Sequence, residues 1–353
     1  MNEHPIVSVV IPVRNSQKYI RQLIDSLLKQ DYRGKMEIIL AGNRDDETWP
    51  AIRDHIDRGR VTIVEVNNPP GWVWRDSNRK RNVAVRKATG TILAFTDSKI
   101  QHPQDWISTG VRLLQDYNVQ AVAGIMVALP KIRSSFFVAY TDKTLVRRNH
   151  RFGDERLLTT KNFGESESLP MTSNFFVLRD RFRAAGGAPE EVAISYEDYA
   201  LAWKLVKGGN TILCTDKLSV YHDHRNKFHD ILKEHRRSGR AAAQFLALYP
   251  NCPYAQRRKW QVIAVASAVI LAIIFIVAIL ALGWTYVLLA FVALGVLGLA
   301  FLGALNILLS KDLRAILFPV LNLLFGLAFT YSFIDGWRKG GHLTIDDGKY
   351  LQT

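Results

Sequence analysis

Short apolar runs alternate with segments of helical periodicity over the N-terminal part of the chain. Residues 7–11 and 36–40 are apolar at nearly every position, which is typical of strands buried on both faces of a parallel sheet. Between them, apolar residues recur at helical spacing over residues 19–28. This order of strand, helix and strand predicts the crossover unit of nucleotide-binding sheets.

The same alternation predicts the rest of an α/β domain. Further strands are expected at residues 61–66, 91–96, 121–127, 174–178 and 211–214, and helices at residues 82–88, 106–116 and 197–207. Residues 131–168 are polar and have no clear period, which indicates an irregular insertion. The predicted fold class is therefore α/β, with helices flanking a Rossmann-like sheet.

No charged residue occurs from Gln261 to Ser310. Because about 20 helical residues cross the hydrocarbon core of a bilayer, this run is long enough for two crossings. A second uncharged run, residues 315–334, has the length of one crossing and contains Pro319 and Asn322. We expect transmembrane helices at residues 261–282, 286–309 and 315–334, with a re-entrant third segment as the alternative.

The chain carries 46 Lys and Arg against 32 Asp and Glu, a formal net charge of +14, and much of the excess lies in residues 225–259. This basic cluster ends where the first hydrophobic segment begins, which suits anionic phospholipids rather than nucleic acid. The positive-inside rule then predicts a multi-pass protein of the cell (inner) membrane with a cytoplasmic N-terminal domain. The alternative is a basic helix face that is merely solvated.

The charges at the ends of the hydrophobic segments do not all fit three crossings. Residues 257–259 and Lys311 lie on the same side if Gly283 is in an external turn. A third crossing would place Arg338 and Lys339 on the opposite side, as an exception to the rule. The expected organisation is a soluble domain (1–225), a basic amphipathic juxtamembrane region (226–260), transmembrane helices (261–336) and a tail (337–353).

Polar residues suited to ligand binding or catalysis follow several of the predicted strands. They are Pro12, Arg14 and Asn15 after the first strand, Asn43 and Asp45 after the second, Asp97, Ser98 and Lys99 after the fourth, and Glu197 and Asp198 later in the chain. Ligands gather at the carboxyl ends of the strands in open α/β sheets. None of these groups is specific alone, but their order along the chain is informative.

In that order the motifs resemble those of the inverting family 2 glycosyltransferases. Their GT-A fold has a Rossmann-like mixed sheet flanked by helices and joins a nucleotide-binding half to an acceptor half, and here it would be followed by the C-terminal transmembrane helices. The resemblance extends from Val7 to Phe245. It implies a membrane-bound enzyme that moves a single sugar from a nucleotide-diphosphate sugar to a lipid-linked or membrane-proximal acceptor, in the synthesis of cell-envelope glycans or glycolipids. A non-catalytic nucleotide-sugar-binding membrane scaffold is the alternative.

The resemblance also implies roles for individual residues. The nucleotide sugar would contact Pro12, Arg14, Asn15, Asn43, Asp45, Arg81, Asn82, Asp97, Ser98, Lys99 and Asn174. Asp198 matches the general base of the family's Glu-Asp pair, and Glu197 would help to position the loop or the acceptor. If the acceptor were a phosphate, which is already ionised, no base would be required. Trp72 and Trp74 could stack on a base or sugar, or pack within their loop.

The family's Asp-x-Asp signature is altered in this chain, because Asp97 is retained but Lys99 replaces the second aspartate. An ammonium group in place of a carboxylate removes a ligand for a hard divalent cation and adds repulsion. Asp97 could still hold Mg²⁺ or Mn²⁺ together with His222 and the donor phosphates. Alternatively, Lys99 and Arg81 could neutralise the leaving diphosphate directly.

Overall fold

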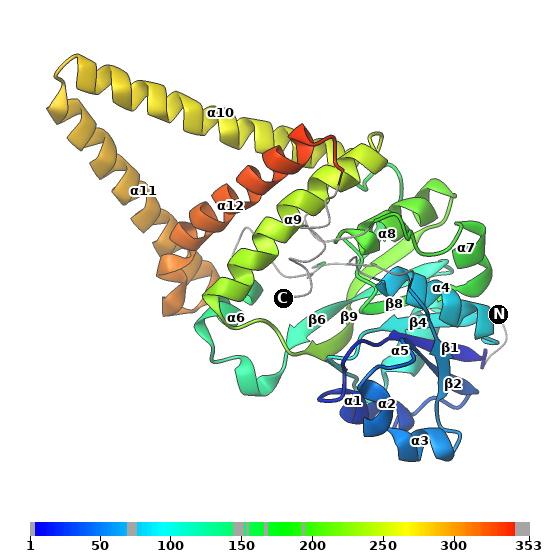
Figure 1. Cartoon of the computed structure of the whole chain (residues 1–353). Helices are drawn as coiled ribbons and strands as arrows, with labels where there is room; N and C mark the ends of the chain where they lie inside the picture. Colours follow the sequence, from blue (N-terminus) through cyan, green and yellow to red (C-terminus); the bar gives the residue numbers. More distant parts are fainter. Residues whose placement is uncertain are drawn as a thin grey trace. The chain divides into compact units, whose positions relative to one another are not determined.

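A computed structural model describes residues 4–68, 76–143, 152, 155–165, 169–192 and 195–342. The chain divides into two compact units. The first unit combines Met1–Pro130, Asn149–His224 and Thr344–Thr353, and the second combines Lys131–Arg148 with Arg225–Leu343. Figure 1 colours the chain from blue at the N-terminus to red at the C-terminus.

The first unit is built on a single sheet of nine strands within the described residues, with the order β3-β2-β1-β4-β8-β6-β9-β5 and with β7 paired to β9. The strands are β1 (Val7–Pro12), β2 (Met36–Gly42), β3 (Thr62–Glu65), β4 (Ile92–Thr96), β5 (Ile100–Gln101), β6 (Ala121–Ala128), β7 (Arg156–Leu158), β8 (Asn174–Leu178) and β9 (Ile212–His222). The strands expected from the sequence at residues 7–11, 36–40 and 91–96 are confirmed.

The sheet is mixed, as the resemblance to the GT-A fold implies. Strands β3, β2, β1 and β4 are parallel to one another, whereas β8 is antiparallel to both β4 and β6. A strand buried on both faces has the same apolar composition in either direction, so the apolar pattern did not reveal this reversal. In the β4–β8 pair, Thr96 lies opposite Asn174. The residue after β4 is therefore directed toward the residue before β8.

Helices cover the sheet and bury its apolar side chains (Figure 1). In the first unit they are α1 (Ile20–Leu28), α2 (Thr48–Ala51), α3 (Arg53–Asp57), α4 (Ser77–Lys87), α5 (Trp106–Asp116), α7 (Arg179–Ala184) and α8 (Glu197–Lys207). The buried stripe of α1, with Leu23 and Leu27, belongs to the same core as Val9 of β1. Helix α5 lies against β8, where the Trp106 and Phe176 rings are 4.8 Å apart.

The regular elements among the described residues of the second unit are helices. They are α6 (Phe136–Lys143), α9 (Phe228–Leu248), α10 (Pro253–Ala281), α11 (Thr285–Ser310), the short 3-10 helix η2 (Leu313–Leu317) and α12 (Phe318–Arg338). Three helical stretches are long and apolar enough to cross a membrane: Pro253–Ala281, Thr285–Ser310 and Leu313–Arg338, with mean hydropathies of 3.3, 2.6 and 1.8. In Figure 1, α10 and α11 meet at one end and diverge as the two arms of an open hairpin, and α12 lies alongside α9.

The prediction of an irregular insertion at residues 131–168 is wrong for part of that segment. Its described residues include the 3-10 helix η1 (Pro130–Ile132), helix α6 and strand β7. Tyr140 of α6 is buried, its ring lies 5.4 Å from that of Phe318, and its hydroxyl donates to Asn322 Oδ1 at 2.8 Å. Helix α6 thus packs against residues far away in the sequence, which no local pattern could indicate.

Candidate active site

Two adjacent hydroxyl groups bring the two candidate aspartates together. Asp97 directly follows β4, and Asp198 lies in the first turn of α8. Because Thr96 is opposite Asn174, Asp97 faces Ser173, whose Oγ donates to Asp97 Oδ2 at 2.5 Å. The hydroxyl of the preceding residue, Thr172, donates to Asp198 Oδ1. Both carboxyl groups are therefore held in one place by consecutive residues at the start of β8.

Arg81 is the positive charge of this cluster. Its side chain comes from α4 and is only 2% exposed, and its Nη2 donates to Asp97 Oδ1 at 3.0 Å. Its Nη1 donates to Asn78 Oδ1 at 3.0 Å, which fixes the guanidinium group in orientation. The Asp97 side chain remains 38% exposed, so one face of the pair is open to solvent. The arrangement places a buried, fixed positive charge directly beside an accessible carboxylate.

The surroundings of Asp198 raise its pKa to about 7. Burial is the main cause, and the charge of the neighbouring Glu197 adds to it. The charge of Arg81 and the hydrogen bond from Thr172 act in the opposite direction, and Asp97 raises the pKa further. A carboxyl group with this pKa is deprotonated in about half of the molecules at neutral pH, which suits a general base.

Replacing Thr172 with valine should move the acid limb of the pH–activity profile to higher pH. The hydroxyl stabilises the ionised form of Asp198, so its loss raises the pKa of Asp198 further above about 7. Activity near neutral pH should fall, and it should recover at alkaline pH as the carboxyl group ionises. The matched control Thr172→Ser keeps the hydroxyl and should retain the original profile. An unchanged limb in Thr172→Val would show that Thr172 does not tune Asp198.

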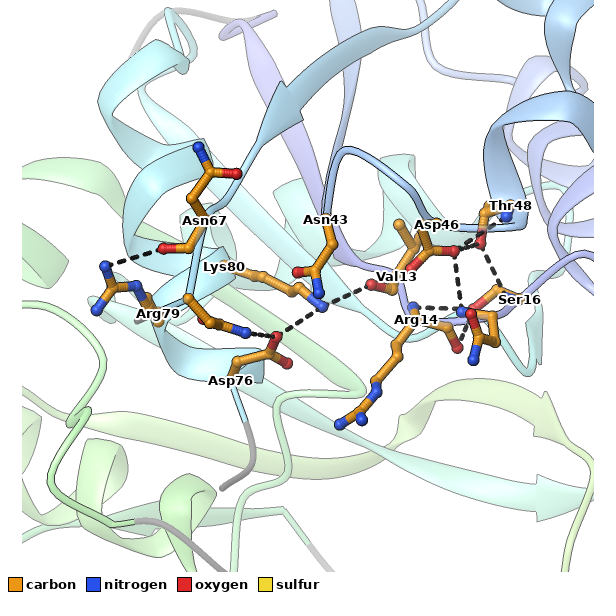
Figure 2. A network of polar contacts seen from close by, with 12 residues as sticks. Val13, Arg14, Ser16, Asn43, Asp46, Thr48, Asn67, Asp76, Arg79 and Lys80 are labelled. Atoms are coloured by element: carbon orange, nitrogen blue, oxygen red, sulfur yellow. Dashed lines mark hydrogen bonds and ion pairs between the residues drawn. The ribbon is translucent and has the colours of Figure 1, made fainter. Parts of the chain in front are cut away.

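A second network joins the loops that follow β1 and β2 (Figure 2). Asp46 Oδ1 accepts hydrogen bonds from Asn15 N at 2.9 Å, from Thr48 N at 3.0 Å and from the Thr48 hydroxyl. Thr48 Oγ1 in turn accepts from Ser16 N at 2.9 Å. Asn15 has a left-handed backbone with φ of 48°. Asp46 therefore holds the strained turn after β1, while the neighbouring Asp45 is exposed and Asn43 is half-buried.

A buried lysine supports the end of β1. Lys80 is 1% exposed, and its Nζ donates to Val13 O at 2.9 Å and lies 2.9 Å from Asp76 Oδ2. Asn68 Nδ2 also donates to that oxygen, at 2.7 Å. The ion pair is nearly fully buried, so its partners must remain together to avoid an uncompensated charge. Lys80 anchors the loop that carries Arg14 and Asn15.

Several residues predicted to contact the donor are engaged within the protein. Asn174 is fully buried, and its amide oxygen accepts a hydrogen bond from Trp106 Nε1. Its amide nitrogen donates to Ile125 O and Leu218 O. The Asn82 amide binds the backbone of Ala188 and the Glu190 carboxylate. Both amides join segments of the fold. A contact of either residue with a donor stays a prediction.

The remaining predicted residues lie at the ends of strands. Pro12 ends β1, and Arg14 after it is exposed. The Ser98 hydroxyl accepts from Ser16 Oγ at 2.9 Å, and Lys99 Nζ lies 5.5 Å from the centroid of the Tyr19 ring. Trp72 and Trp74 lie outside the described residues.

His222 ends β9, where it lies opposite Ile100 of β5, and its Nδ1 is 2.7 Å from His224 Nδ1. Over the part of the chain that the structure describes, no group of three or more His, Cys, Asp or Glu side chains has the arrangement of a metal site. Asp97 has a half-exposed carboxylate whose oxygens each retain a lone pair after binding Arg81 and Ser173. This donor set fits a cation that takes most of its ligands from a bound diphosphate.

Reasoning from the sequence did not identify several residues of these networks. Among them are Asp76, Lys80, Thr172 and Ser173. The spacing of Asp76 and Lys80, four residues apart at the start of a helix, was the one local signal available. The Thr172-Ser173 pair stands directly before a predicted strand, but its function depends on the antiparallel register of β8.

Comparisons with known proteins agree with the fold. The family model "Glycosyl transferase family 2" matches residues 8–180. The pre-mycofactocin glycosyltransferase of Mycobacterium tuberculosis is 25% identical over 257 residues, which are 70% of this chain and 49% of that protein. The glycosyltransferase AglE of Haloferax volcanii is 24% identical over 243 residues, 68% of this chain and 74% of that protein.

Among solved structures, the mannosyltransferase PcManGT of Pyrobaculum calidifontis, in complex with GDP-Man and Mn²⁺, has a TM-score of 0.60. It is 20% identical, and the match covers 92% of this chain and 88% of that one. The family model covers just under half of this chain, and the likeness to PcManGT shows the fold, in which a mixed sheet with flanking helices is of the GT-A type. This chain spans about half the length of the mycobacterial relative.

Proposed function

We propose that the protein transfers a single sugar from a nucleotide-diphosphate sugar to an acceptor hydroxyl, with inversion at the anomeric carbon. The observation that carries this proposal is the pairing of Asp97 and Asp198 by Ser173 and Thr172. It gives one carboxyl group with a pKa of about 7 and one beside a fixed guanidinium group. An inverting transfer needs both a base for the acceptor and a positive environment for the leaving diphosphate.

In the proposed reaction, the Asp198 carboxylate removes the proton of the acceptor hydroxyl. The hydroxyl oxygen forms a bond to the anomeric carbon from the side opposite the diphosphate. The bond between that carbon and the diphosphate oxygen breaks, and the electron pair leaves with the diphosphate. Arg81 would offset the developing negative charge, with Lys99 as a second cation. Glu197 supports the reaction by keeping the pKa of Asp198 high enough for proton uptake.

A divalent cation, Mg²⁺ or Mn²⁺, belongs to the proposal because Asp97 keeps an accessible carboxylate beside the place for the diphosphate. When bound, such an ion would neutralise charge on the phosphate oxygens. Asp97 would hold it together with the donor, and His222 stays a candidate further ligand. The solved complex of PcManGT contains GDP-Man and Mn²⁺, which makes this pair the first to test.

The acceptor is proposed to be lipid-linked or close to a membrane, and the site to face the cytoplasm. Three apolar helical stretches support membrane association. The basic residues before the first of them favour the cytoplasmic side of a cell membrane and contact with anionic phospholipids. A role in cell-envelope glycan or glycolipid synthesis fits this placement.

The function is tested by incubating the purified, lipid-reconstituted protein with a panel of nucleotide-diphosphate sugars, with and without EDTA. We expect one sugar donor of the panel to release its nucleoside diphosphate faster than the others, and a membrane lipid extract to increase that rate. Asp198→Asn is the matched control for the chemical step. Donor binding without any turnover over the whole panel would instead support the non-catalytic membrane scaffold.

A further inference from the structure

Helix α12 has one apolar face that contacts the protein and one that is exposed. The exposed side chains recur every three or four residues, as expected for one face of a helix. They are Val320, Leu323, Leu324, Leu327 and Tyr331. On the opposite face, Leu321, Phe325 and Phe333 are buried. An exposed apolar stripe of this length in a helix next to candidate membrane spans indicates contact with lipid.

The buried face of α12 packs against α9 along most of its length. The rings of His235 and Phe325 are stacked 4.6 Å apart near one end of the contact. In the middle, a Cβ atom on Gly239 would lie 2.3 Å from Phe329 O, so the two backbones approach closely. Near the other end, Gly336 of α12 faces Ala243. Residue numbers rise together in these pairs, so the two helices run parallel. Because they are in close contact along this length, α9 must have the same depth and tilt in a membrane as α12.

Helix α9 cannot enter the hydrocarbon core at low cost. The part of α9 in contact with α12 carries charged residues on three consecutive turns: Lys233, Glu234, Arg236, Arg237 and Arg240. Insertion scales assign roughly 2.5 to 3.5 kcal/mol to each charged residue at the centre of a membrane helix. Ion pairs such as Arg240 with Asp335 reduce this cost but do not remove it. If α12 crossed the bilayer, it would carry these charges into it.

Both ends of α12 lie beside the charged ends of the hairpin formed by α10 and α11. At its C-terminal end, the Trp337 ring lies 5.8 Å from Nζ of Lys259, which precedes the apolar part of α10. The two residues line a cavity of about 310 Å³ together with Leu246 of α9. At its N-terminal end, Asp312 binds Lys143 and Arg314 directly after α11. If α10 and α11 each cross the bilayer once, the chain returns after α11 to the side of Lys259. The N-terminal end of α12 follows α11 directly and its C-terminal end lies beside Lys259, so both ends of α12 are on that side.

We propose that α10 and α11 cross the bilayer as a hairpin, and that α12 lies in the plane of the leaflet on the side of Lys259. Its exposed stripe, Val320 to Tyr331, contacts the acyl chains, and α9 covers its water-facing side. The partner of this surface is a bilayer with anionic headgroups, which the arginines and lysines of α9 attract.

This arrangement places Arg338 and Lys339 on the same side as Lys311 and residues 257–259. All of these charges then obey the positive-inside rule, and the exception that a third crossing requires disappears. The inference rests on the proposed membrane association but not on sugar transfer, because thiol accessibility and label depth can be measured in a protein without transferase activity.

The side of the C-terminal end of α12 is tested with single cysteines in the full chain, at Lys339→Cys, Lys311→Cys and Trp284→Cys. Membrane-impermeant thiol reagents are applied to intact cells and to inside-out vesicles. Cysteines at 339 and 311 should react only in inside-out vesicles, and the cysteine at 284 only in intact cells. The parent chain is the blank, because Cys214 and Cys252 are buried. Reaction of the cysteine at 339 in intact cells would overturn the proposal.

The depth of α12 is tested with nitroxide labels at Leu323, Leu327 and Tyr331 in protein reconstituted with anionic phospholipids. Oxygen and a water-soluble relaxation agent report the depth of each label. The three labels should give similar, shallow depths, whereas control labels at Ile270 and Val277 of α10 should differ in depth from each other. A steady change in depth along α12, or labels with no exposure to lipid, would contradict the in-plane arrangement.

Discussion

Replacing Asp198 with asparagine should lower kcat for transfer to a hydroxyl acceptor by about 10²- to 10⁴-fold. The amide has nearly the shape of the carboxyl group and can still accept a hydrogen bond from Thr172, but it cannot take up the acceptor proton. The affinity for the donor should remain nearly unchanged, because the acceptor base is not needed to bind the nucleotide. Steady-state kinetics gives the first quantity, and calorimetry with the donor gives the second.

The pH profile of the parent enzyme provides the control. A base whose pKa is about 7 is active when deprotonated, so kcat should rise with pH below neutrality and level off above it. Glu197→Gln removes a charge that raises this pKa, so the rising limb should move to lower pH. Turnover of Asp198→Asn at the parent rate would exclude Asp198 as the base. It would point to a phosphate acceptor, which needs none.

Replacing Asp97 with asparagine should weaken binding of the nucleotide-diphosphate donor at least tenfold in the presence of Mn²⁺. Even the mutation of residues that only hydrogen-bond to metal ligands typically lowers metal affinity by about 10- to 100-fold. The substitution removes the negative charge that a divalent cation requires but retains the size of the side chain. The same change takes away the carboxylate that pairs with the buried Arg81. Titration calorimetry with the donor, with and without Mn²⁺, measures the effect.

The control for this experiment is Ser173→Ala, which removes the hydrogen bond to Asp97 but leaves its charge. It should reduce donor affinity less than Asp97→Asn does. A thermal unfolding curve of each variant separates a loss of binding from a loss of folding. If Asp97→Asn binds the donor as tightly as the parent in the presence of Mn²⁺, and EDTA changes the affinity of neither, the diphosphate is held by Arg81 and Lys99 without a cation.

The pattern of apolar residues was sufficient to locate most strands and helices. Strand β1 and helix α5 lie within one residue of their predicted bounds. Each has a clear pattern of apolar residues, a continuous run in β1 and helical spacing in α5. The order of motifs was also enough to select Asp97 and Asp198 as residues of interest. Their individual roles stay predictions.

The partners of these residues were not accessible from local patterns. Asp46, in the loop after the second strand, proved to be a buried acceptor for Asn15 and Thr48. Asn174, predicted as a donor contact, uses its amide to connect Trp106 with β6 and β9. A hydrogen bond between distant segments depends on their register, and register is a property of the folded sheet.

The sequence by itself determined that this chain has an α/β domain and long apolar helices, because buried strands and membrane-length segments have a local signature in hydrophobicity. The tertiary structure alone decided that Ser173 and Thr172 join Asp97 to Asp198. The antiparallel pairing of β8 with β4 places Ser173 beside Asp97, and the adjacent Thr172 binds Asp198. It also decided that α12 packs along the charged helix α9. Contacts of this kind arise from the packing of distant segments, which hydrophobic periodicity does not encode.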